Sequence, residues 1–170
     1  MFIHPKNLAE IFSLIEEAKM KTYSLLIPTN EIENLNTDQY EFIANMVKTD
    51  VKEEYIKITI NDVLPPNVGL SKNDIKFYWL SLMNYAFKGI ETKYTNLLCI
   101  IRIFSPAPYW DVENRAIKVV IDSLRYNQLI PDDRSEFLKC LLVGETDRKN
   151  PRTEIFLREY PQDELWFLNA

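Results

Sequence analysis

One segment of the chain places acids and a lysine around a single short amphipathic helix, a pattern suited to metal-dependent phosphate chemistry. Four carboxylates flank the expected helix, with Asp111 and Glu113 before it and Asp132 and Asp133 after it. Carboxylates at both ends of a helix can converge on a hard cation such as Mg²⁺, which takes oxygen ligands. Lys118 lies within the helix, and a lysine beside such an ion suits phosphodiester hydrolysis. We therefore take this segment as the candidate active site.

The segments that must position these residues alternate between helical and extended patterns. Apolar residues recur at helical spacing in residues 8–20, after Thr37, in 71–88 and in 114–126. Residues 55–60 and 97–104 read as strands, 23–27 as a short β-prone run, and 137–143 with 153–157 as a hairpin. These elements predict an α+β fold, a small mixed sheet packed against two long helices.

The chain divides at a charged run, residues 48–54. We expect residues 1–53 to form a mostly helical N-terminal extension and residues 54–170 to form the main domain, ending in a C-terminal tail. The extension is too short to bury a core of its own, so we expect it to pack on the main domain.

The helix and its flanks resemble the RusA family of Holliday-junction resolvases. The matching residues follow the family pattern of paired acids, a K-x-x-x-D helix and a closing acid pair: Asp111, Glu113, Asn114, Lys118, Asp122, Ser123-Leu124 and Asp132-Asp133. The preceding strand, the Pro65-Pro66 turn and the closing NPRTEIFLR strand also agree with the family, so that the resemblance covers roughly residues 54–160.

This resemblance implies a RusA-like fold and Mg²⁺-dependent endonuclease activity on four-way junctions or other branched DNA, with roles in recombination and repair. Asp111, Glu113 and Asp133 would hold the metal, with Asp132 as a further ligand, and Lys118 would stabilise the transition state. Family members act as homodimers, so the same is implied here. The basic residues placed to contact DNA are Arg115, Arg125, Arg148, Lys149 and Arg152.

The residues alone leave other interpretations open. Asp111 and Glu113 could be ordinary helix-start acids that complement the helix dipole. Lys118 and Asp122 could form a surface ion pair contributing only ~0.3–0.5 kcal/mol. A catalytically inactive relative is the alternative function, a DNA- or protein-binding module of a mobile element such as a prophage, with residues 1–53 binding a protein partner.

Composition excludes several classes of site. The chain has one histidine, two cysteines and three glycines, which is too few for a zinc site, a Ser-His-Asp triad or a phosphate-binding glycine loop. Cys99 and Cys140 lie in apolar stretches and are expected to be buried, inert thiols. The net charge of −5 is concentrated in residues 1–53. No apolar run is long enough to cross a bilayer and no signal peptide is evident, so we expect a cytoplasmic protein.

Overall fold

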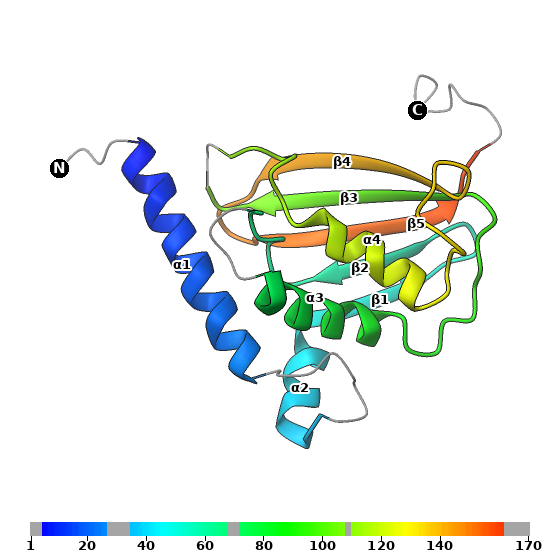
Figure 1. Cartoon of the computed structure of the whole chain (residues 1–170), viewed down its shortest axis with the longest axis horizontal. Helices are drawn as coiled ribbons and strands as arrows, with labels where there is room; N and C mark the ends of the chain where they lie inside the picture. Colours follow the sequence, from blue (N-terminus) through cyan, green and yellow to red (C-terminus); the bar gives the residue numbers. More distant parts are fainter. Residues whose placement is uncertain (1–4, 27–34, 68–71, 108–109, 162–170) are drawn as a thin grey trace.

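A computed structural model of the protein describes residues 5–26, 35–67, 72–107 and 110–161. These residues form four helices and five strands (Figure 1). The helices are α1 (Pro5–Leu26), α2 (Thr37–Met46), α3 (Lys72–Ala86) and α4 (Ile117–Tyr126). The strands are β1 (Val47–Val51), β2 (Ile56–Ile60), β3 (Leu97–Ser105), β4 (Leu138–Thr146) and β5 (Arg152–Glu159).

The five strands form one mixed sheet in the order β1-β2-β5-β3-β4. Strand β5 lies between β2 and β3 and is antiparallel to both of them. Strand β4 pairs in parallel with β3, and α4 lies on the crossover between these two strands. The sheet therefore ends in β1 on one side and β4 on the other, so these two are its edge strands.

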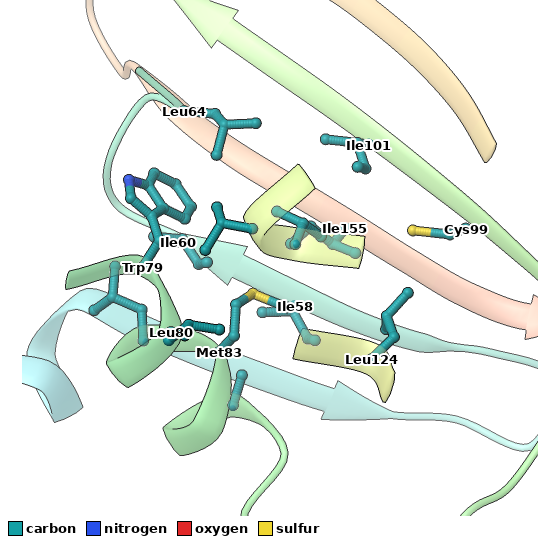
Figure 2. Close-up of a cluster of buried hydrophobic side chains, with 14 of the residues drawn as sticks. Ile58, Ile60, Leu64, Trp79, Leu80, Met83, Cys99, Ile101, Leu124 and Ile155 are labelled. Carbon is teal, nitrogen blue, oxygen red and sulfur yellow. The ribbon is translucent and has the colours of Figure 1, made fainter. Parts of the chain in front are cut away.

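Helices α3 and α4 cover one face of the sheet (Figure 1). The strands alternate, with Ile58 of β2, Ile101 of β3 and Ile155 of β5 buried toward these helices. Figure 2 shows the side chains of α3 and α4 meeting those of the sheet in this core. Trp79 and Met83 of α3 are fully buried there. The hydrophobic effect of this layer holds the two helices on the sheet.

A buried polar cluster fastens α1 to this core. Asp62, just after β2, accepts hydrogen bonds from Tyr78 Oη at 3.0 Å and from the Val63 backbone at 2.7 Å, and it pairs with Lys19 of α1. Lys19 also pairs with Glu16 at 3.0 Å. Burial raises the pKa of Glu16 above its usual value. The cluster thus satisfies most of the charge that α1 brings to the core.

The sequence prediction holds for the α+β class and for the main elements, with four corrections. The two helices on the sheet are short, at 15 and 10 residues, whereas α1 is the longest at 22 residues. The β-prone run at residues 23–27 is helical as far as Leu26. A strand that was not predicted, β1, lies in the charged run and pairs with β2. Strands β4 and β5 do not pair with each other, because each pairs with β3.

Whether residues 1–53 form a unit distinct from 54–170 stays a prediction. Residues 1–53 supply α1, α2 and β1, so the predicted boundary falls between two paired strands. The tail beyond residue 161 lies outside the described residues.

Candidate functional site

The loop after β2 and the loop before α4 are joined by backbone hydrogen bonds, and this junction positions the candidate site. Asn67 N donates to Asn114 O at 3.1 Å, and Ala116 N donates to Pro65 O at 2.9 Å. Arg115 is buried between the loops, where its Nη1 donates to Leu64 O at 3.0 Å. Because the Pro65-Pro66 turn cannot supply backbone donors of its own, it serves here as an acceptor. The start of α4 is therefore fixed by the proline turn.

On one side of this junction lies an open acidic pocket of about 490 Å³, which we call the acidic pocket. It is lined by Trp110, Asp111, Val112, Glu113, Gly144, Glu145 and Thr146. The Arg115 guanidinium lies over the Trp110 ring in a cation–π contact, 4.5 Å from the ring centroid. Glu145 is paired with Arg102 of β3. Asp111 and Glu113 are exposed, so the pocket is a solvated acidic surface next to the end of β4.

On the other side lies a groove between α3 and α4 of about 540 Å³, which we call the helix groove. Its lining consists of Asn67, Ile75, Lys76, Leu80, Ala116, Lys118, Val119 and Asp122. Lys118 donates to Asp122 at 3.1 Å, and 77% of the Lys118 side chain is exposed. Lys118 therefore belongs to this groove and does not line the acidic pocket, contrary to the expectation that it joins the acids.

The remaining predicted acids lie in the turn after α4. Asp132 accepts a hydrogen bond from Asp133 N at 2.8 Å and pairs with Arg134 at 2.9 Å. The Asp133 backbone hydrogen bond is the main cause of the lowered pKa of Asp132, and Arg134 adds to it. Neither acid lines the acidic pocket or the helix groove. Local hydrogen bonding, rather than a shared cation, accounts for the position of Asp132.

The predicted single centre is thus divided among three places: Asp111 and Glu113 in the acidic pocket, Lys118 in the helix groove, and Asp132 with Asp133 in the turn. Among the described residues, no group of three or more acids, cysteines or histidines could hold a metal ion. The four carboxylates do not fit the arrangement that Mg²⁺ requires. Magnesium binding stays a prediction without a formed site in this part of the chain.

The five basic residues proposed to contact DNA are also dispersed. Arg115 is buried. Arg152 pairs with Asp147 and Glu154 and stacks 3.6 Å from the Phe104 ring centroid. Arg125 lies over the ring of Tyr126, at 5.5 Å from its centroid, and Arg148 and Lys149 are exposed in the β4–β5 loop. The five residues therefore do not form one exposed basic surface.

Several residues of the two sites were not singled out from sequence. Ile75 and Leu80 appeared only as part of an amphipathic helix, and Asn67 only as part of a turn. Gly144 falls in the loop of the predicted hairpin. Gly144 lies in β4, paired with β3, and the Trp110 ring lies against it. The sequence signal for this close approach was a glycine next to a strand-like stretch.

Comparison with known proteins found no protein-family model that matches the chain and no matching curated protein. Three solved structures show a weak likeness to the chain at low identity. The cell wall anchor of the type VI secretion system (T6SS) from Pseudomonas aeruginosa has a TM-score of 0.43 and 12% identity, covering 71% of this chain and 92% of its own. The periplasmic domain of Helicobacter pylori MotB has a TM-score of 0.40 and 14% identity, covering 72% and 85%.

The third structure is a MotB-like protein from Desulfovibrio vulgaris, with a TM-score of 0.38 and 18% identity, covering 94% of this chain and 98% of its own. Likeness at this level is confined to coarse features of the fold. The three structures are a cell wall anchor and two MotB or MotB-like proteins, not resolvases. No RusA family model matches the chain, and the predicted acids do not come together among the described residues, so the RusA assignment was wrong. The nuclease function, the inactive RusA-like alternative, the recombination role and the branched-DNA partner are withdrawn with it.

Membrane insertion of the described helices finds no support in the structure. None of the helices in residues 5–26, 35–67, 72–107 and 110–161 is long and apolar enough to span a bilayer. The compartment in which the chain works is a separate question, considered below.

Proposed function

We propose that this chain is a binding module for a small amphipathic anion, a molecule with an apolar body and one acidic group, which docks in the helix groove. The observation that carries the proposal is the groove itself, since its volume of about 540 Å³ falls in the range of ligand pockets. Its floor is apolar and its rim is polar, as in most small-molecule binding sites.

The floor of the groove is built before any ligand arrives. Ile75 and Leu80 of α3 are 6% and 1% exposed, and Ala116 and Val119 beside them are 5% and 8% exposed. The core holds these side chains in place, so they lose little conformational entropy when a ligand binds. An aliphatic or aromatic body would bury its surface against them, at about 25 cal/mol for each Å² removed from water.

The rim favours a negative group. Lys76 and Lys118 supply two cations, whereas Asp122 supplies one carboxylate and pairs with Lys118. The surplus positive charge is therefore best placed at Lys76, which is exposed on α3. A carboxylate or sulfonate on the ligand would interact with this lysine and with the Asn67 amide at the mouth of the groove.

The test uses the fluorescent anion 8-anilinonaphthalene-1-sulfonate as the probe and octanoate as a competitor. Val119→Phe fills the groove and should abolish probe binding, whereas Leu141→Phe on the exposed edge strand β4 is the matched control and should leave it unchanged. Lys76→Gln should weaken binding by about two- to fivefold, as expected for an exposed charge. All variants must melt near the parent temperature.

Two results would overturn the proposal. Probe binding that survives Val119→Phe would place the ligand elsewhere. Binding that falls equally in Leu141→Phe would indicate a general affinity for exposed apolar surface.

We place this module in a reducing compartment such as the cytoplasm. What supports this is the pair of free cysteines, one of them exposed, because exposed thiols persist where glutathione and thioredoxin keep them reduced. Measurement of thiol status in rapidly acid-quenched cells would test it, and a constitutive disulfide would count against it.

A further inference from the structure

The two cysteines are direct partners across the parallel strands β3 and β4. Cys99 is paired in register with Cys140, so both side chains leave the sheet on the same face. Adjacent strands lie about 4.8 Å apart. That separation falls within the range of roughly 4.4–6.8 Å between Cα atoms that a disulfide requires.

The two thiols differ in their access to solvent. Cys99 is fully buried in the core, among the side chains in Figure 2, whereas Cys140 is exposed. The exposure follows from topology, because β4 is an edge strand of the sheet. The expectation that both cysteines are buried is therefore wrong for Cys140.

The two thiols differ in acidity as well. The neighbouring Cys99 thiol lowers the pKa of Cys140 despite its partial burial. The neighbouring Cys140 thiol, together with burial, raises the pKa of Cys99. The thiolate is the nucleophile in thiol chemistry, so Cys140 is the more reactive of the two.

We propose that Cys140 and Cys99 form a hydroperoxide-reactive pair, in which exposed Cys140 is oxidised first and buried Cys99 resolves it to a β3–β4 disulfide. In the first step the Cys140 thiolate attacks one peroxide oxygen. The O–O bond breaks, the departing alkoxide or hydroxide takes a proton, and Cys140 becomes a sulfenic acid.

In the second step the Cys99 sulfur attacks the sulfenic sulfur of Cys140. The S–S bond forms as the S–O bond breaks, and the hydroxide leaves with the Cys99 proton as water. Overall two thiols lose two electrons, and one hydroperoxide is reduced to an alcohol, or water, plus water. Because Cys99 needs only to reach its strand neighbour, it can form the disulfide while it stays buried.

The experiment treats the full reduced chain with hydrogen peroxide, alkylates the remaining thiols and measures the intact mass. We expect both thiols to disappear together, with the mass of the chain lower by two hydrogens, no covalent dimer, and complete recovery with dithiothreitol. Cys140→Ser should leave Cys99 reduced. Cys99→Ala should accumulate a sulfenic acid at Cys140 that dimedone traps.

Other outcomes would overturn the proposal. One is oxidation of Cys140 to sulfinic acid while Cys99 stays alkylatable in the parent chain. Another is a disulfide between two molecules. A third is equal oxidation of Cys99 in the parent and in Cys140→Ser. Melting curves of both variants show whether they are folded, and Cys99→Ser replaces Cys99→Ala if the alanine variant is not.

Discussion

The indole of Trp110 lies directly over Gly144, so that a Cβ added at this glycine would be 2.9 Å from Trp110 Cη2. The same Cβ would be 3.1 Å from two carbon atoms of Val112. Gly144 is therefore required by the close approach of the loop to β4, and the wall of the acidic pocket depends on this contact.

Gly144→Ala should destabilise the protein by about 1–3 kcal/mol, because the tryptophan must move away from the strand. Urea denaturation measures the loss, and the tryptophan emission of the folded state should shift toward the red. Trp110→Phe removes the atom that clashes, so the double variant should be less destabilised than the sum of the single changes. Additive losses would show that the ring does not press on the strand.

Glu154 in the central strand β5 collects three cations on the face of the sheet away from the helices. Lys57 lies at 3.2 Å, Arg152 at 2.9 Å and Arg102 at 3.7 Å, and 7% of the Glu154 side chain is exposed. Glu154→Gln should cost about 2–3 kcal/mol, because it leaves these cations without their shared partner. Glu136→Gln, which changes an exposed acid paired with Arg134, is the control and should cost little.

This effect should depend on pH. Burial alone would raise the pKa of Glu154, but hydrogen bonds from Arg152 and Lys57 outweigh burial and lower it. A lowered pKa means that the carboxylate stabilises the fold above the ordinary value of 4.5 and loses that contribution as the pH falls through the folded-state value. Denaturation of the parent and Glu154→Gln should therefore converge in acid, and a constant difference would contradict this assignment.

Lys19 should account for much of the attachment of α1. Lys19→Met removes the cation that pairs with buried Asp62, which should cost about 3 kcal/mol. Lys21→Met, which affects the more exposed Lys21–Glu17 pair on the same helix, should cost no more than ~0.5 kcal/mol. Equal losses in the two variants would show that the Asp62 cluster contributes nothing specific.

The Lys19 contribution has the opposite pH dependence. Burial alone would lower its pKa, but Asp62 and Glu16 raise it above the ordinary value of 10.5. A raised pKa means that the stabilisation is complete below 10.5 and disappears as the pH rises through the folded-state value. The stability difference between the parent and Lys19→Met, followed by urea denaturation, should therefore shrink only in strong alkali.

Truncation tests the predicted boundary at residue 53. A fragment of residues 54–170 lacks β1 and the fully buried Met20 and Ile43. It should melt well below the parent and aggregate, because β2 becomes an exposed edge. A fragment of residues 47–170 keeps β1, and comparison of the two by calorimetry separates edge protection from core packing. A 54–170 fragment that melts like the parent would establish it as an independent domain.

The elements that the sequence predicted well are those whose signal is local. Strand β3 is a long apolar run, and α3 has a clear helical period, so their residues alone indicate their type. The strand β1 was missed because Lys48 and Asp50 point outward from a short edge strand and resemble a linker. Edge strands commonly carry such charges.

The site could not be predicted because it depends on where distant segments meet. Asp111 and Asp133 are separated by a 10-residue helix, and nothing local specifies whether its two flanks fold back toward each other. Lys118 lines the helix groove and pairs with Asp122, and this position depends on how α4 packs against α3. The exposure of Cys140 likewise follows from strand order, which an apolar sequence stretch does not reveal.

The position of β5 sets the order in which this sheet can be completed. It is the last of the five strands along the chain, yet it lies between β2 and β3 and pairs with both. Until residues 152–159 have left the ribosome, β2 and β3 have no partner on their facing sides and the hydrophobic layer beneath them stays open. The sheet can therefore be completed only after nearly the whole chain has been synthesised, and a chaperone that shields those two strands would be most useful before that point.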